Sequence, residues 1–407
     1  MFDITSPAIY IPAIFLALVF SLALLIAKDA RFSREYPMEE LPYYDEINLS
    51  MGYIKRNILE SGRFKYRKNV DSSIKYDNKI YNSLRHAGIL YSMYMYEKCG
   101  YKNTYKEDRL KSCQYFINRY IKKWGNKHYV VVSLPKEEQI NMPIAKTGAV
   151  GIALCALSNL LPEKKISAEI LQGLGDFLLY MQAADGRMYA YLDLEANKIN
   201  KEAEAVFYTS EAAFGLLNLY EVDNQMKWLH AAKKAILYVV KNTKEIDKDA
   251  PFDHWAILTI EKLLQKNWIL EDERKLLISY VERVLITTIG NQITDKDNSY
   301  FGAFYENLRP GSIGTIMEGL AASYNCTDNE DFKELLYKSL SIGCLFLNKV
   351  QVKTGAQAGG VPNSANWVVA GVSPNASVIR MDNVQHVILA WLNFQQIIKS
   401  RPAITQE

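Results

Sequence analysis

The chain has 407 residues, of which 49% are hydrophobic, and its formal net charge is +3. This length allows a large buried core, and a near-neutral charge without a block of basic residues is not typical of a nucleic-acid-binding protein. The five cysteines are scattered without a CxxC spacing, which argues against a disulfide framework and against a zinc cluster. We therefore expect no nucleic-acid partner, no metal and no cofactor.

The first 28 residues contain an uncharged run of 20 residues, 8–27, which is long enough to cross a bilayer as one helix. No lysine or arginine precedes the run, as a cleaved signal peptide would require, whereas Lys28, Arg31 and Arg34 follow it. These features predict a single-pass anchor in the cell membrane at 1–28. The positive residues favour the cytoplasmic side for the rest of the chain, and the periplasmic or extracellular side is the alternative.

Residues 29–44 are charged and contain two prolines, so they are expected to form a linker before a main domain at 45–400, with a tail at 401–407. Helical segments within this domain alternate between two kinds, one apolar almost all round and one with an apolar and a charged face. The first kind is expected at 81–96, 142–161, 207–220, 252–264, 311–324 and 382–398. The second kind is expected at 45–61, 106–122, 166–181, 225–242, 271–289 and 330–348.

Each apolar segment with its amphipathic neighbour is typical of a helical hairpin that has an inner and an outer member. The segment at 45–61 can cover the last apolar helix, so that the row of hairpins closes. The sequence therefore predicts an all-α fold, an (α/α)6 toroid, and the alternative is an open row whose end repeats need polar caps. Short strand-like pieces at 129–134, 188–192 and 300–305 are expected as β-hairpins on the rim of one mouth.

Charged and histidine side chains stand near the start of each apolar segment. If all inner helices begin at one mouth, these side chains converge on a common cavity. Glu211 is the one acid at the start of an almost wholly apolar helix, and a buried acid must be paired or functional. The catalytic candidates are Glu211, Asp253, His254, Asp382 and His386. Helix capping by the two aspartates and a buried Asp–His pair at 382 and 386 remain alternatives.

A second set of residues is expected to bind the substrate. The candidates are Arg85, His86, Lys146, Asp185, Tyr208, Trp255, Trp367 and Arg380. Basic side chains among them can clamp a carboxylate or another anion, and the aromatic ones can stack on sugar faces. A structural role is the alternative for Arg85, and a simple turn is the alternative for Asp185 with Gly186.

Two local patterns accompany the six inner segments. Gln182, Asp185 and Gly186 precede a rim strand, and Tyr208-Thr209-Ser210-Glu211-Ala212 opens an apolar helix. Together with the six hairpins, these patterns resemble the six-hairpin glycosidase-like superfamily over about residues 45–400. Proteins of this shape include glycoside hydrolases, polysaccharide lyases, sugar epimerases of the N-acylglucosamine 2-epimerase type and terpene cyclases. The DxDD pattern of one cyclase class and the Cys and His zinc pattern of lanthionine cyclases are absent.

The resemblance implies a membrane-anchored enzyme that acts on a glycan or a sugar conjugate. Glycoside hydrolysis is the first expectation, with Glu211 paired with Asp253 or Asp382 as the two carboxyl groups that such a reaction needs.

Two alternatives remain open. In the first, the chain is a sugar epimerase or isomerase, in which His254 and His386 are bases and Arg85 or Arg380 polarises the carbonyl oxygen. Otherwise it is a non-catalytic toroid that binds a glycan or a protein partner in a membrane assembly. In that case the acids of the mouth should lie apart or be neutralised by arginine and lysine.

Overall fold

The computed structural model describes residues 38–101, 104–243, 252–304, 308–369 and 375–401. The anchor expected at 1–28, most of the expected linker and all but the first residue of the tail lie outside these ranges. Among the helices that are described, none is long and apolar enough to cross a membrane.

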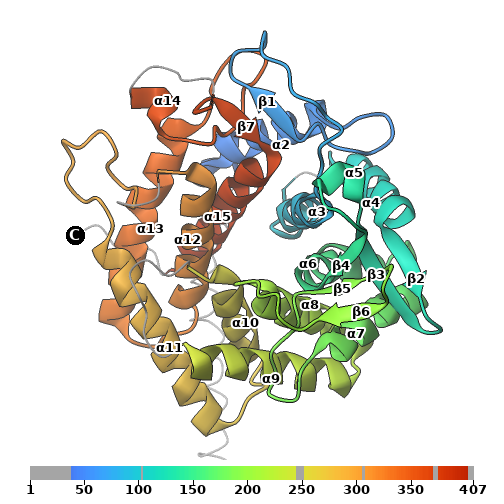
Figure 1. The fold of residues 1–407 in the computed structure, drawn as a ribbon. Coiled ribbons are helices and arrows are strands. Elements are labelled where there is room, and N and C mark those ends of the chain that lie inside the picture. The colour runs from blue at the N-terminus through green and yellow to red at the C-terminus, as the bar shows by residue number, and fades with distance from the viewer. Residues whose placement is uncertain (1–37, 102–103, 244–251, 305–307, 370–374, 402–407) are drawn as a thin grey trace, which may run out of the picture.

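Six helices form an inner ring around a common axis (Figure 1). They are α3 (Ser83–Lys98), α6 (Thr147–Leu157), α8 (Tyr208–Asp223), α10 (His254–Gln265), α12 (Pro310–Tyr324) and α15 (Met381–Ser400). Each packs on the next in this order, and α15 packs on α3, so the ring is closed. Every residue of α6 is buried, as its apolar sequence predicts for a helix with neighbours on all sides.

Six further helices surround the inner ring. They are α2 (Tyr44–Arg56), α4 (Lys106–Tyr120), α7 (Ala168–Met181), α9 (Met226–Asn242), α11 (Glu271–Gly290) and α13 (Glu330–Val350). Each of these helices packs on an inner neighbour, and α2 packs on α15, which closes the outer layer across the two ends of the chain. The prediction of a closed (α/α)6 toroid is therefore confirmed. Short helices complete the described chain: η1 (Met38–Glu40), α5 (Pro135–Glu138), η2 (Ser158–Leu160) and α14 (Asn366–Val369).

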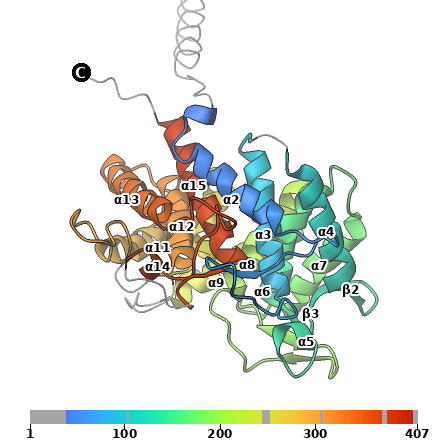
Figure 2. The same ribbon diagram turned by 90° about the horizontal axis from the view of Figure 1, so that it is seen from above.

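A five-stranded antiparallel sheet lies at one mouth of the toroid. In spatial order its strands are β2 (Ile121–Trp124), β3 (His128–Ser133), β4 (Ile144–Lys146), β5 (Tyr191–Asp193) and β6 (Lys198–Asn200). Because β4 runs directly into α6, the sheet marks the mouth where the inner helices begin. Figure 2 shows this sheet at the end of the molecule opposite the last turns of α15. Of the strand expected at 300–305, the structure describes 300–304, and these residues contribute a single bridge between Phe304 and Gln292.

A second, two-stranded sheet joins distant parts of the chain. β1 (Arg67–Asn69) pairs antiparallel with β7 (Val378–Arg380), and β7 leads into α15. The amide of Met381 donates to the carbonyl oxygen of Tyr66 over 3.1 Å. This pairing fixes the start of the last inner helix beside the loop that precedes the first.

The turn after α7 is built around Gln182. Its side-chain amide donates to the carbonyl oxygen of Gly186 over 3.2 Å and to that of Ala231 in α9 over 2.9 Å. Gly186 has a φ of 108°, and an added Cβ would lie 2.4 Å from the carbonyl oxygen of Lys234. Asp185 is exposed and accepts a bond from the amide of Arg187, so it is a turn residue on the outer surface. These contacts fit the turn that was the alternative for Asp185, and its role in substrate binding stays a prediction.

Glycines allow α6 and α8 to approach closely. A Cβ added at Gly151 would lie 2.3 Å from the carbonyl oxygen of Glu211. We expect Gly151→Ala to lower the free energy of unfolding by about 1–3 kcal/mol, because helix backbone faces the new methyl group. Urea denaturation tests this. Gly290→Ala is the matched control, since nothing lies within 4 Å of the added carbon, and it should be neutral or stabilising. Equal unfolding midpoints for the two variants would contradict the prediction.

Candidate active site at the mouth where the inner helices begin

Two histidines near the starts of inner helices α10 and α15 contact each other. His254 is the first residue of α10 and is buried, and His386 lies in the second turn of α15. Their ring centroids are 5.6 Å apart, and the planes are nearly perpendicular at 85°. Nε2 of His254 is buried and has no hydrogen-bond partner among the described residues. Burial, and then the neighbouring His386, hold the pKa of His254 well below its usual value, so the ring is neutral at physiological pH.

Glu318 orients the second histidine. This residue of α12 is 1% exposed, and its Oε1 lies 2.7 Å from Nδ1 of His386. Burial raises the pKa of the carboxyl group, and His386 opposes that shift. With the proton on Nδ1, Glu318 accepts the bond and Nε2 of His386 keeps its lone pair, which is the form that a general base needs.

The same three side chains could hold a metal ion. Ligand atoms of His254, Glu318 and His386 lie within 4.8 Å of one another. Two histidines with one glutamate is a set that catalytic zinc sites use, and the unpartnered nitrogen of His254 fits that chemistry. Helix starts could not predict this set, because Glu318 stands in the middle of α12.

Glu211 is a buried carboxyl group on the neighbouring helix α8. It is 5% exposed, and its Oε2 has no hydrogen-bond partner among the described residues. The group is pressed against Gly148 in α6, where an added Cβ would lie 2.0 Å from Oε2 and 2.5 Å from the ring of Tyr208. Burial, and then the charge of Asp253, raise the pKa of Glu211 to about 8. The carboxyl group is therefore protonated at neutral pH, and Tyr208 is half-buried beside it.

Asp253 forms structural hydrogen bonds with both of its carboxylate oxygens. Its Oδ1 accepts from the amide of Ala256 over 3.1 Å as the N-cap of α10, and its Oδ2 accepts from the hydroxyl of Ser210 over 2.6 Å. Burial raises its pKa to about 6, and these bonds oppose the shift. Asp253 thus ties the start of α8 to that of α10, which brings Glu211 and His254 to the same mouth.

Asp382 is neutralised by two arginines. Both oxygens accept from the guanidinium of Arg380, one over 3.0 Å, and Arg85 lies 3.4 Å away. The hydroxyl of Tyr66 donates to Oδ1 over 2.6 Å. Although burial alone would raise the pKa of Asp382, Arg85 and Arg380 hold it below the usual value. The carboxylate is therefore not a free acid. Among the described residues, His386 bonds Glu318 and not Asp382, so the expected Asp–His pair is not observed.

Lys146 also has a partner at this mouth. Its ammonium group forms an ion pair with Glu138, which accepts two further bonds from the amide and the hydroxyl of Ser83. Lys146 is half-buried where β4 meets α6. The pair joins the rim helix α5 to two inner helices.

Three predicted binding residues lie elsewhere. His86 is in the core, where Nδ1 bonds the hydroxyl of Tyr81 over 2.6 Å and Nε2 the carbonyl oxygen of Ser112 over 3.1 Å. Burial lowers its pKa to about 3, so it is a neutral structural histidine. Trp255 is buried, and its ring already packs on those of His254, Phe214 and Tyr91. Trp367 lies over the end of α13 and donates from its indole nitrogen to the carbonyl oxygen of Val350 over 3.0 Å.

Comparisons with known proteins identify the fold. No family model matches the chain, and neither does any curated protein sequence. A D-mannose isomerase structure is 13% identical, with a TM-score of 0.63, over 89% of this chain and 100% of that one. A GH76 α-mannanase from Bacteroides thetaiotaomicron is 14% identical, with a TM-score of 0.59, over 89% and 98%. A sugar epimerase from a ruminal bacterium is 13% identical, with a TM-score of 0.60, over 85% and 98%. The chain has the six-hairpin glycosidase-like fold that the sequence resemblance predicted.

Proposed function

We propose that this chain is a carbohydrate-active enzyme that moves a proton on a sugar, as an aldose–ketose isomerase or a sugar epimerase. The observation that carries the proposal is the pair of facing histidines, one oriented by a buried glutamate and the other neutral with a free nitrogen. Two solved structures with this fold, the D-mannose isomerase and the sugar epimerase, support this class of reaction, whereas the α-mannanase supports hydrolysis.

The reaction needs a base and a group that polarises the carbonyl oxygen. His386 takes the proton from C2 of the open-chain aldose, the C2–H electrons form the C1=C2 double bond, and the C1=O π electrons move onto O1, which takes a proton from its donor to give an enediol. In an isomerisation His386 then gives the proton that it holds, or one exchanged with solvent, to C1, while O2 loses its proton to the group that protonated O1 and becomes the ketone oxygen. An epimerisation instead needs a protonated group at the opposite face of C2; His254 fills this role after it has taken a proton from solvent, and His386 then loses its proton to solvent. Neutral His254 can donate a hydrogen bond to the substrate oxygen, as a neutral imidazole does in other isomerases.

A protonated Glu211 is the second donor. The sequence suggested Arg85 or Arg380 for the carbonyl oxygen, but both guanidinium groups are committed to Asp382. A neutral carboxylic acid in an apolar site can donate a strong hydrogen bond to a developing oxyanion. Glu211 lies at the start of the inner helix next to that of His254 and has an unpartnered oxygen.

The direct test is incubation of the full chain with D-mannose and other hexoses in D2O. We expect conversion to a second sugar with deuterium at C1 or C2, read by NMR. Release of reducing ends from α-1,6-mannotriose, with no deuterium at carbon, would overturn the proposal in favour of hydrolysis. Hydrolysis is the second candidate because Glu211 and Asp253 are neighbouring carboxyl groups, but both oxygens of Asp253 are already bonded.

Metal dependence separates acid–base chemistry from a metal mechanism. If His254 and His386 act as proton donors and acceptors, dialysis against EDTA should leave the rate within about twofold, whereas saturating Zn²⁺ should lower it by about tenfold or more by occupying the lone pairs. Metal analysis of the protein and the rate after each treatment measure this. A rate that is lost with EDTA and restored by one metal ion would instead assign a metal to these residues.

We also propose that residues 1–28 anchor the protein in the cell membrane with the toroid on the cytoplasmic side. The uncharged run at 8–27, followed by basic residues, supports this. Deletion of 1–28 should move the protein from the membrane fraction to the soluble fraction without loss of turnover. A full-length chain that is recovered in the soluble fraction, or that protease added outside intact cells digests, would contradict the anchor or its orientation.

A further inference from the structure

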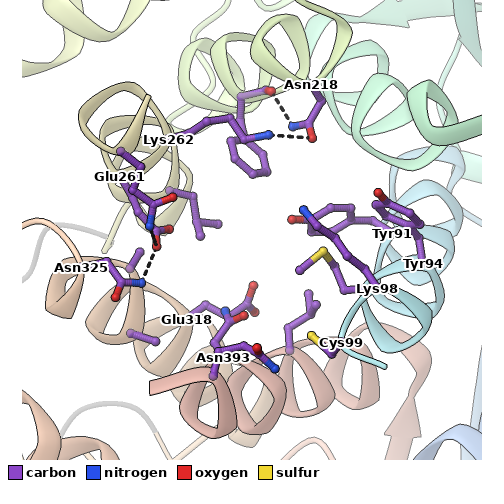
Figure 3. A pocket seen from close by; sticks show the side chains of 18 residues that line it. Tyr91, Tyr94, Lys98, Cys99, Asn218, Glu261, Lys262, Glu318, Asn325 and Asn393 are labelled. Carbon is purple, nitrogen blue, oxygen red and sulfur yellow. Dashed lines mark hydrogen bonds between the residues drawn. The ribbon is translucent and has the colours of Figure 1, made fainter. Parts of the chain in front are cut away.

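A cavity lies within the ring of inner helices at the opposite mouth, where these helices end (Figure 3). Its volume is about 320 Å³, at the small end of the range of about 300–1,000 Å³ that is usual for ligand sites. Side chains from five inner helices line it: α3, α8, α10, α12 and α15. Of the residues placed in the candidate active site, Glu318 is the one that also reaches this cavity.

The cavity wall offers both donors and acceptors, and its lysines and carboxyl groups are equal in number. Lys98 and Lys262 balance Glu261 and Glu318. The wall also has five side-chain amides, Asn218, Gln265, Asn325, Asn393 and Gln396. An amide side chain donates and accepts hydrogen bonds, as a hydroxyl group does. Apolar side chains such as Phe214 provide a surface for C–H groups. This combination fits a small neutral molecule with several hydroxyl groups.

Hydrogen bonds hold much of the wall in place. Glu261 accepts from the amide of Asn325 over 2.6 Å, and burial raises its pKa to about 7. Lys262 donates to Oδ1 of Asn218 over 3.1 Å and to Glu221 over 2.6 Å. Because these side chains are already ordered, a ligand would not have to immobilise them on binding.

Several polar side chains of the wall remain uncommitted, and Lys98 and Asn393 are two of them. Lys98 and Asn393 form no hydrogen bond or ion pair with any residue that the structure describes. Figure 3 shows both of them reaching into the cavity, from α3 and from α15. They are the groups that a bound molecule would engage.

We propose that this cavity is a second binding site for a neutral polyhydroxylated molecule of monosaccharide size, and that Glu318 couples its occupancy to the active site. A hydroxyl group that donates to Glu318 from the cavity competes for the charge that holds Nδ1 of His386, 2.7 Å away. The ligand thereby weakens the orientation of His386 without occupying the mouth where the sugar reacts. Binding at this site does not require the proposed reaction, whereas the coupling does.

The test uses the full chain and D-glucitol, a polyol without a carbonyl group that the enzyme cannot isomerise. We expect one D-glucitol in the cavity in crystals soaked with it, and inhibition of hexose isomerisation that lowers kcat and leaves KM unchanged. Lys98→Met and Asn393→Leu should each weaken D-glucitol binding about tenfold in isothermal titration. Lys338→Met, which changes an exposed lysine of α13, is the matched control and should leave the affinity unchanged.

Water alone in the cavity at saturating D-glucitol would overturn the proposal, and so would an affinity that neither Lys98→Met nor Asn393→Leu reduces. Purely competitive inhibition, with D-glucitol at the active mouth, would also overturn it. These results are distinct from failure of the proposed function, which a lack of hexose conversion by the unmodified chain would reveal.

Discussion

His386→Ala should lower kcat for sugar isomerisation by about 10²–10⁴-fold, the contribution that a positioned general base makes. KM should change little, because the side chain acts on a proton and does not supply most of the binding energy. Glu318→Gln should lower kcat by about 10–100-fold, since an amide can still bond the imidazole but does not enforce the tautomer that leaves Nε2 free. Steady-state kinetics and deuterium exchange at C2 without net conversion would measure both effects.

The exposed His230 on outer helix α9 provides the matched control. His230→Ala should retain the full rate, since its side chain faces solvent on the outside of the toroid. If His386→Ala kept C2 exchange at the wild-type rate, His386 would not be the base, and the facing pair would have to be structural. If Glu318→Gln lowered kcat as much as His386→Ala does, the carboxylate of Glu318 would do more than orient the imidazole ring.

Much of the fold could be predicted because the burial of a helix determines the pattern of apolar residues in its sequence. An inner helix contacts neighbours on every side, so it is apolar all round, and an outer helix is amphipathic. These two patterns alternate along the chain, and the structure has its helices at the expected places. The short strand expected at 300–305 failed for a different reason. Its residues favour a strand, but they form one bridge to Gln292, because β propensity alone does not determine which segments pair.

The site was harder to predict because sequence position gives the mouth of the toroid but not the direction of a side chain. His254 and His386 converge as the helix starts suggested, whereas His86, also near a helix start, turns outward into the core. Glu318 could not be found from helix starts, since it is brought to His386 by the close packing of α12 on α15. The pairing of Asp382 with Arg85 depends on the packing of α15 on α3, and its bond from Tyr66 lies beside the β1–β7 ladder, so both join residues about three hundred positions apart.

Glu211→Leu should lower kcat by about 10²–10³-fold, the usual cost of removing one donor to a developing oxyanion. Glu211→Gln should keep the rate within about tenfold, because its amide donates a hydrogen bond without carrying a proton that titrates. The unmodified enzyme should lose activity above about pH 8, where Glu211, with its pKa raised to about 8, ionises. This loss should be absent in Glu211→Gln. Equal inactivity of the Gln and Leu variants would exclude a role as a neutral donor and would favour hydrolysis, in which the carboxyl group itself must transfer a proton.

The same carboxyl group gives a test of its charge that does not depend on turnover. The pKa of Glu211 is about 8 in the folded chain, compared with the usual value of 4.5, so between these values the unfolded chain has released a proton that the folded chain retains. Stability therefore falls as the pH rises through this window. Glu211→Gln removes the effect and should be more stable than the unmodified chain by on the order of 3 kcal/mol at pH 7 but not at pH 4. Urea denaturation at the two pH values measures the difference. A stability gain that is the same at both pH values would mean that Glu211 is ionised in the folded protein, and an ionised Glu211 could not donate to the substrate oxygen.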